Sequence, residues 1–223
     1  MKMVSSETLK KLNSLSTSCI SDAMDRLGIE GCLFGIKGQT KANRICGQAY
    51  TVHYVPCGVK KGTVGDFLDD VKPGEVIVID NSGRLNCTVW GGIMAHVAHH
   101  KEIAGTLIDG VCRDIDEVNA AQYAVFSKNV YMRTGKDRVE VDYVQKPVCI
   151  CGIQVKPGDV IVGDDNGALC IPAEFAEKVC QAAEMINEVE SHIVEATSQG
   201  SSLKAAREKY GYHKLQSRIA AKN

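Results

Sequence analysis

The chain has 223 residues, of which 44% are hydrophobic and 24% charged, and its 26 basic and 27 acidic side chains leave a formal net charge of −1. This composition is typical of a globular protein with one large domain or two small ones; it excludes intrinsic disorder and argues against a dedicated nucleic-acid binder. No stretch approaches the roughly 18 consecutive apolar residues of a membrane span, and the polar residues 1–12 predict neither a signal peptide nor an anchor, so we expect a cytoplasmic protein.

Helical and strand patterns alternate along the chain. Ser5 and Ser6 predict the N-cap of a first short helix, and a second helix over residues 18–27 is predicted to end at Gly28. Residues 49–55 predict a strand, and the apolar runs at 76–79 and 105–108 predict strands buried on both faces. Further helices are predicted over residues 65–70, 90–101, 115–122, 172–196 and 201–221, with short strands between 122 and 171. This alternation indicates an α/β domain.

One segment of the chain occurs twice. Residues 71–83 recur as residues 155–167 at an offset of 84, with nine of thirteen positions identical. Each copy is a Pro-Gly turn that leads into an apolar strand and ends in acidic and turn residues. We interpret the two copies as equivalent strand entries in one sheet system, rather than as a duplicated binding site.

Ten cysteines are unusually many for a chain of this length, but no two form a C-x-x-C pair. This spacing supports neither a zinc ribbon nor a thioredoxin-type redox site. Most of the cysteines lie in apolar runs, so we predict buried, reduced thiols, with a disulfide framework as the alternative. Cys112 is likewise predicted to be buried and inert rather than a nucleophile.

Two groups of residues have the chemistry of a ligand site. Gly91 and Gly92 fall at the start of a predicted helix, where free backbone N–H groups favour an anion and glycine permits its close approach. Arg113 and Asp114 follow a predicted strand, where α/β proteins commonly bind ligands. Arginine can hold a carboxylate with two hydrogen bonds, and aspartate can supply one oxygen ligand to Mg²⁺. The alternative is an exposed, salt-bridged turn in which Asp114 caps the following helix.

Several segments resemble the RraA-like family, which includes 4-hydroxy-4-methyl-2-oxoglutarate aldolases that also decarboxylate oxaloacetate. The similarity extends from about residue 15 to residue 183, and its most specific element is the Asp-Gly-x-x-Arg-Asp pattern of residues 109–114. The matching segments are residues 18–28, Gly65-Asp66-Phe67, Trp90-Gly91-Gly92, residues 109–117 and residues 155–167.

The resemblance implies an α/β fold, a swivelling-type β/β/α sandwich that forms a single domain with C-terminal helices. We therefore expect an RraA-like domain over residues 1–183 and a helical extension over residues 184–223 that packs on the same domain or on a neighbouring subunit. The resemblance also implies that the protein forms a homotrimer, or a hexamer built from two trimers, with the sites between subunits.

The resemblance further implies a divalent-metal-dependent lyase. Asp114 would bind the metal, Mg²⁺ or Mn²⁺, and Arg113 would contact a small 2-oxo acid substrate, so that these two are the expected catalytic residues. The carboxylate of the substrate would lie on the backbone of residues Gly91, Gly92, Ile93 and Met94. Cleavage next to the keto group leaves a pyruvate enolate, whose charge a metal ion and an arginine both stabilise.

The chain departs from the best-characterised aldolases of the family at Gly92, where those enzymes carry an acidic side chain. Aldol cleavage needs a base for the hydroxyl proton, whereas decarboxylation does not. The expectation of a decarboxylase is therefore firmer than that of an aldolase. The alternative function is a non-enzymatic, protein-binding regulator of ribonuclease activity, but family members of that kind lack the complete Arg–Asp pair that this chain has.

Other polar clusters are interpreted as surface features. The histidines at 96, 99 and 100 could include a zinc pair at i, i+4, but no glutamate accompanies them as in H-E-x-x-H, so we predict surface histidines. The acidic residues at 66, 69 and 70 are predicted to be helix-face charges, and those at 164 and 165 to belong to a turn. Asp109 is expected to orient Arg113. The basic tail, residues 201–223, is predicted to be a solvated helix rather than an RNA-binding segment.

Overall fold

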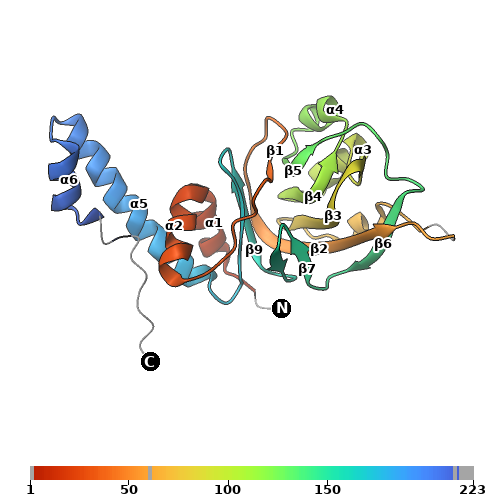
Figure 1. The fold of residues 1–223 in the computed structure, drawn as a ribbon, viewed down its shortest axis with the longest axis horizontal. Coiled ribbons are helices and arrows are strands. Elements are labelled where there is room, and N and C mark those ends of the chain that lie inside the picture. The colour runs from red at the N-terminus through yellow and green to blue at the C-terminus, as the bar shows by residue number, and fades with distance from the viewer. Residues whose placement is uncertain (1–2, 60–61, 213–214, 216–223) are drawn as a thin grey trace.

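The computed structural model describes residues 3–59, 62–212 and 215. The chain folds into a mixed α/β sheet covered by helices, with two further helices at its C-terminal end (Figure 1). The elements are α1 (Ser6–Ser14), α2 (Thr17–Leu27), β1 (Lys37–Gly38), β2 (Ile45–Pro56), the 3-10 helix η1 (Asp66–Asp70), β3 (Val76–Thr88), α3 (Gly92–His100), β4 (Gly105–Cys112), α4 (Ile115–Ala120), β5 (Val125–Val130), β6 (Val139–Val144), β7 (Val148–Ile150), β8 (Ile153–Val155), β9 (Val160–Asp164), β10 (Gly167–Ile171), α5 (Ala176–Ser198) and α6 (Leu203–Lys209).

The main sheet has the strand order β1-β5-β4-β3-β2-β9-β10, and β6 also pairs with β2. Strands β2, β3, β4 and β5 are parallel neighbours, whereas β9 and β6 pair with β2 in the antiparallel direction. Strand β2 connects the two halves, since residues 45–48 pair with β9 and residues 49–53 pair with β3. The parallel half therefore places the carboxyl ends of β3, β4 and β5 at one edge of the sheet.

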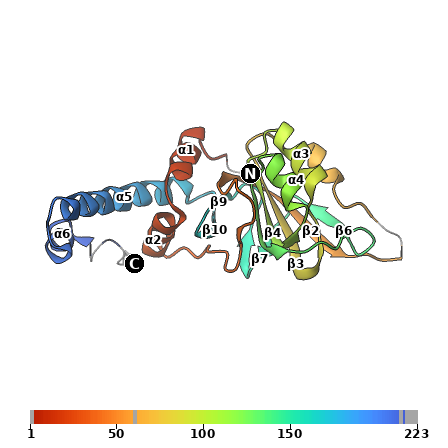
Figure 2. The same ribbon diagram turned by 90° about the horizontal axis from the view of Figure 1, so that it is seen from above.

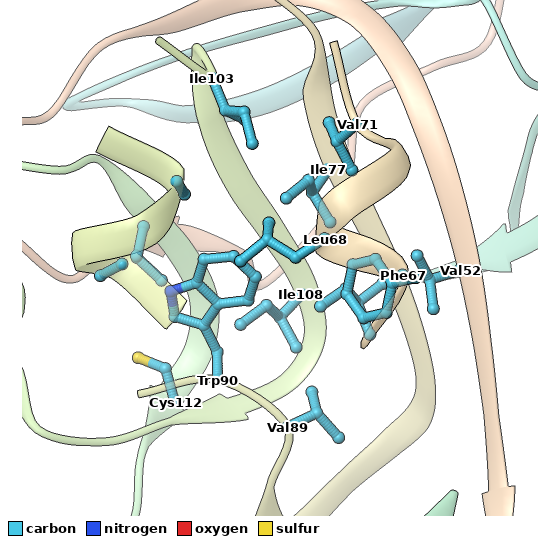
Figure 3. Close-up of a cluster of buried hydrophobic side chains, with 14 of the residues drawn as sticks. Val52, Phe67, Leu68, Val71, Ile77, Val89, Trp90, Ile103, Ile108 and Cys112 are labelled. Atoms are coloured by element: carbon cyan, nitrogen blue, oxygen red, sulfur yellow. The ribbon is translucent and has the colours of Figure 1, made fainter. Parts of the chain in front are cut away.

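Three apolar clusters hold the layers together. Helices α3 and α4 and η1 cover one face of the parallel strands, where Trp90 packs among Phe67, Leu68 and Ile108 (Figure 3). Helices α1, α2 and the first half of α5 pack on β9 and β10. The third cluster includes Phe126 and combines side chains from both halves of the sheet with side chains of β7 and β8. The apolar runs that predicted buried strands form the centre of this core, because every residue of β4 is buried.

The C-terminal helices extend away from the sheet (Figures 1 and 2). Helix α5 continues through residue 183, where we expected the domain to end and the helical extension to begin. Ala183 and Ile186 still belong to the apolar cluster that α1 and α2 form with β9 and β10. Further along, Ile193 and Ala196 pack instead against Ala206 of α6. The outer half of α5 is therefore stabilised mainly by its own helical hairpin with α6. None of the helices in the described part of the chain is long and apolar enough to span a membrane.

Several element ends differ from the sequence prediction. Strand β3 continues to Thr88 although turn residues follow Asp80. Ser82 and Gly83 adopt positive φ angles of 54° and 65°, and the strand then pairs with β4 again in a shifted register. Strand β4 continues to Cys112 rather than ending near residue 109. Pro172 lies in a turn before α5 rather than opening it. Of the predicted helix 201–221, residues 203–209 are helical, and residues 213–214 and 216–221 lie outside the described residues.

The two copies of the repeated segment have the same local structure. In each copy, the carboxylate of the residue after the Pro-Gly pair accepts a hydrogen bond from the backbone N–H of the lysine before it. Glu75 accepts from Lys72 at 2.8 Å, and Asp159 accepts from Lys156 at 2.8 Å. The strands that follow, β3 and β9, are both neighbours of β2. The interpretation as equivalent strand entries is therefore confirmed.

All ten cysteines lie within the described residues and are free thiols, so the disulfide alternative is wrong. Burial raises the pKa of the Cys112 thiol above its ordinary value, in agreement with an inert role. The prediction of burial is confirmed for five of the ten cysteines; the other five are partly buried or exposed, namely Cys46, Cys57 and Cys151, and Cys32 and Cys149.

Candidate active site

The site lies at the carboxyl end of β4, one of the two inner strands of the parallel group. Arg113 and Asp114 follow β4 directly and precede α4. The backbone of Asp114 adopts a left-handed conformation, with φ 57° and ψ 44°, and this turn leads the chain from β4 into α4. A non-glycine residue rarely adopts this conformation, although aspartate tolerates it better than most residues. The buried sheet and the helix thus fix the position of this turn.

The Asp114 carboxylate contacts helix α3 rather than its own helix. Its Oδ2 accepts a hydrogen bond from the backbone N–H of Gly92 at 3.2 Å and lies 3.3 Å from Nε of Arg113. Asp114 occupies the N-cap position of α4, but its side chain makes no capping hydrogen bond there. The alternative of a simple capping turn is therefore wrong for the side chain, which points across to the first turn of α3.

Gly91 and Gly92 make this contact possible. A Cβ atom on Gly91 would lie 2.5 Å from Asp114 Oδ2, and a Cβ atom on Gly92 would lie 2.7 Å from the Cβ of Glu117. Neither glycine has a positive φ angle, so the requirement is for space and not for backbone conformation. The glycine pair that sequence analysis singled out therefore brings the N-terminus of α3 close to the Arg113–Asp114 turn.

The backbone and Nε of Arg113 have partners within the site, whereas its terminal guanidinium nitrogens have none in the described part of the chain. Its backbone N–H donates to the Trp90 carbonyl at 3.1 Å, and its Nε lies beside the Asp114 carboxylate. Within the described residues its two terminal nitrogens have no partner, and 37% of the side chain is exposed. The terminal nitrogens are thus available to hold a carboxylate with two parallel hydrogen bonds.

The first turn of α3 supplies further donors. The N–H of Ala95 is the first to bond within the helix, to the Gly91 carbonyl at 3.1 Å, so the amides before it have no intrahelical acceptor. Asp114 uses the N–H of Gly92. Within the described chain the N–H groups of Ile93 and Met94 have no acceptor, so they remain for an anion at the positive end of the helix dipole.

These groups surround a pocket of about 280 Å³, a size suited to a small molecule. Its wall includes Val64 and Gly65, which lie before η1, and Thr88, Thr134 and Gly135. No sequence pattern pointed to Thr88, Thr134 and Gly135, because they are brought together by a bridge between Thr88 and Thr134 and by the hydrogen bond from Thr88 N–H to the Arg133 carbonyl, both between segments far apart in the chain. Asp114 also lines two neighbouring pockets, so the site is open on more than one side.

The donor set of the site fits a hard divalent cation. Oδ2 of Asp114 is used by Gly92 and Arg113, whereas no group in the described chain donates to Oδ1. Among the described residues, no group of three or more histidine, cysteine or acidic side chains is placed to hold a metal ion. One carboxylate is too few for a structural zinc site, but Mg²⁺ and Mn²⁺ are commonly held by one or two carboxylates, with water and substrate as the other ligands. Asp114 could therefore hold such an ion.

Other candidate residues lie elsewhere. The prediction that Asp109 orients Arg113 is wrong, because its carboxylate contacts Lys128 at 2.5 Å and the N–H of Cys151 at 3.0 Å, on β5 and in the β7–β8 turn. The acidic residues of η1 and the three histidines of α3 are exposed, as predicted. Asp165 belongs to a turn, as predicted, whereas Asp164 is the last residue of β9 and accepts a hydrogen bond from the N–H of Asn166 in that turn.

Fold and site together define an α/β protein with an open pocket, rich in unused donors, at the carboxyl end of a parallel strand. The chain belongs to the RraA-like family, since the model of that family, described as Aldolase/RraA, matches residues 17–170. The architecture expected from the resemblance is confirmed, because the crystal structure of Streptomyces coelicolor RraAS2, described as an unusual member of the RraA protein family, has the same fold with a TM-score of 0.76.

Three similar proteins place the chain within the family. Protein DlpA of Legionella pneumophila is 39% identical over 218 residues, which are 94% of this chain and 35% of DlpA, so the chain spans about a third of that relative. A protein of Halalkalibacterium halodurans named "Putative 4-hydroxy-4-methyl-2-oxoglutarate aldolase" is 30% identical over 82% of this chain and 85% of its own length. The crystal structure of an uncharacterised protein from Pseudomonas syringae pv. tomato is 41% identical, has a TM-score of 0.87 and covers 93% of this chain and 100% of its own.

Proposed function

We propose that the protein is a divalent-metal-dependent lyase that cleaves a carbon–carbon bond of a pyruvate-containing 2-oxo acid. The observation that carries the proposal is the convergence of unused groups on one pocket. These are one carboxylate oxygen of Asp114, the terminal nitrogens of Arg113 and the free N–H groups at the start of α3. A small dianionic oxo acid would satisfy all of them at once.

The binding roles follow from the geometry of these donors. The N–H groups of Ile93 and Met94 would hold the carboxylate next to the keto group, at the positive end of the α3 dipole. Arg113 would hold an oxygen of the substrate with its terminal nitrogens, while Asp114 keeps Nε in place. The substrate would thus be fixed at its keto acid end.

Asp114 would hold the metal ion, Mg²⁺ or Mn²⁺, through Oδ1. When bound, such an ion polarises the carboxylate and keto oxygens of the substrate as a Lewis acid. Arg113 adds a fixed positive charge at the place where the enolate oxygen develops charge as the bond breaks. A preorganised charge of this kind lowers the barrier because it needs no rearrangement during the reaction.

We also propose that copies of the chain assemble around this site, as a homotrimer or a hexamer. Apolar side chains rim the open pockets, with Ile93 exposed by 85%, Met132 by 75%, Val97 by 36% and Tyr131 by 38%. An apolar rim of this kind is typical of a surface that another chain covers. Sedimentation equilibrium of the wild type and of Met132→Lys tests the assembly, and a monomeric wild type would contradict it.

The experiment that tests the function is pyruvate release from oxaloacetate and from 4-hydroxy-4-methyl-2-oxoglutarate, with Mg²⁺ and with EDTA. Both rates are corrected for spontaneous and metal-only decay, and Asp114→Asn serves as the matched inactive control. EDTA-sensitive turnover of either substrate supports the proposal, and turnover of both supports an aldolase. Turnover of neither would overturn it and favour the protein-binding regulator.

A further inference from the structure

Glu117 of helix α4 occupies the space above Gly92. A Cβ atom on Gly92 would lie 2.7 Å from the Cβ and 3.4 Å from the Cγ of Glu117. Glu117 also lies one helical turn after Asp114, and residues three apart on a helix share a face. The side chain therefore starts beside both Asp114 and the first residue of α3.

The carboxylate of Glu117 is not used for structure. The Asp-x-x-Glu spacing would allow it to bond back to the N–H of Asp114 as in a capping box, but no such bond forms. No hydrogen bond or ion pair of this side chain exists within the described residues, and the side chain is exposed. Glu117 thus keeps an unpaired carboxylate close to the site.

Glu117 lines a pocket of about 630 Å³ that it shares with Asp114, Gly92 and His96. This pocket adjoins the 280 Å³ pocket, since Gly92, Ile93 and Asp114 line both of them. Asp114 and Glu117 are the two carboxylates among the residues that line the pockets around the site. With Asp114 engaged by Gly92 and Arg113, Glu117 is the carboxylate left to accept a proton.

We propose that Glu117 is the base for aldol cleavage at this site, where the substrate is a 4-hydroxy-2-oxo acid; this inference rests on the proposed function. The Glu117 carboxylate takes the proton of the C4 hydroxyl, the C3–C4 bond breaks, and C4 becomes a carbonyl carbon. The electron pair of the broken bond stays with the C1–C3 fragment as a pyruvate enolate. The proton that Glu117 has gained then returns to C3 and completes pyruvate.

Decarboxylation gives an internal control for this role. Loss of carbon dioxide from oxaloacetate forms the same enolate without removing a hydroxyl proton. A residue needed only as the base therefore affects aldol cleavage and leaves decarboxylation intact. A residue that merely supports α4 or the Asp114 turn would affect both reactions together.

The test compares Glu117→Gln with Asp116→Asn, which removes a neighbouring exposed charge from the same first helical turn. We expect Glu117→Gln to lower kcat for cleavage of 4-hydroxy-4-methyl-2-oxoglutarate at least 100-fold, within the range for loss of a general base. Decarboxylation of oxaloacetate is expected to stay within twofold, and Asp116→Asn to stay within twofold for both. Mn²⁺ affinity by calorimetry and the thermal midpoint should match the wild type in both variants.

The outcomes separate this inference from the function on which it rests. An equal loss of both activities, or no loss of either, would overturn the role of Glu117. A wild type that decarboxylates oxaloacetate but cleaves no 4-hydroxy-2-oxo acid would also overturn it, while the lyase proposal would stand. A wild type with neither activity would refute the proposed function itself. His96→Asn addresses the other group in this pocket, and we expect it to keep both activities.

Discussion

Two aspartates near strand ends show how differently one residue type can be used. Asp164 at the end of β9 accepts hydrogen bonds from the N–H of Thr17 at 2.8 Å, its hydroxyl at 2.6 Å and the N–H of Asn166 at 2.9 Å. Asp114 beyond β4 accepts one from Gly92, and its side chain is 36% exposed against 12% for Asp164. The first carboxylate is almost fully satisfied, whereas the second has capacity for a ligand.

The difference shows where stability and function are located. Asp164 connects α2 to the β9–β10 turn, so its hydrogen bonds join two elements of the core. Asp114 holds a left-handed turn and an unused oxygen in an open pocket. We therefore expect changes at Asp114 to affect turnover and changes at Asp164 to affect folding.

The largest expected effect is on turnover in Asp114→Asn. Asparagine tolerates the left-handed conformation and can still accept a hydrogen bond from Gly92, so the turn should survive. The negative charge that would hold the metal is lost, and we expect kcat/KM for oxaloacetate to fall at least 1,000-fold, about 4 kcal/mol of transition-state stabilisation. The free energy of unfolding should change by less than about 1 kcal/mol. Metal-dependent turnover at the wild-type rate would remove Asp114 from the site.

The next effect is on folding in Asp164→Ala. The substitution leaves the two buried donors of Thr17 and the partly buried N–H of Asn166 without an acceptor, and we expect the free energy of unfolding to fall by about 3 kcal/mol. The turnover per folded molecule should be unchanged. Urea denaturation measures the loss, with Asp165→Ala as the control, because Asp165 is exposed. Equal losses in the two variants would mean that burial and hydrogen bonds do not distinguish these neighbours.

The contrast between the two aspartates also marks what the sequence could predict. Local patterns were sufficient where the cause is local, as in the left-handed Gly28 that ends α2 and the repeated Pro-Gly turns that open β3 and β9. The pairing of Gly91–Gly92 with Arg113–Asp114 was also within reach, because a helix start and a strand end meet at one sheet edge.

What the sequence could not predict depends on distant contacts. Asp109 lies on a buried strand that continues beyond it, so its side chain meets Lys128 and the β7–β8 turn rather than Arg113. The Asp114 side chain contacts α3 because Gly91 leaves space for it, which cannot be deduced from either segment alone. The spacing of Glu117 three residues after Asp114 was visible, but its position above Gly92 was not.

A smaller effect on turnover is expected for Arg113→Lys. Lysine keeps the positive charge but loses the planar group that bonds to Asp114 through one nitrogen and leaves two others for the substrate. We expect kcat/KM for oxaloacetate to fall at least tenfold, about 1.4 kcal/mol, with Mn²⁺ affinity unchanged. Steady-state kinetics and calorimetry measure the two quantities. Wild-type kinetics would show that the fork of Arg113 does not contact the substrate.

The smallest and most specific effect is on the pH dependence of stability. Asp159 and Asp164 lie in the same copy of the repeat, but their pKa values shift in opposite directions. Burial dominates at Asp159 and raises its pKa above the ordinary value of 3.8. Burial acts in the same direction at Asp164, but the hydrogen bonds from Thr17 and Asn166 outweigh it and lower the pKa below 3.8.

The two shifts predict opposite slopes in acid. A lowered pKa in the folded state stabilises the protein above the unfolded pKa, and this contribution is lost as the pH falls through the folded value; a raised pKa stabilises below the unfolded value and is lost as the pH rises through the folded one. As the pH falls below about 4, the stability advantage of the wild type over Asp164→Asn should therefore shrink. Over the same fall in pH, the stability of the wild type relative to Asp159→Asn should increase. Urea denaturation of the three proteins between pH 3 and pH 7 measures both slopes. Parallel slopes would mean that the hydrogen bonds of Asp164 do not outweigh its burial.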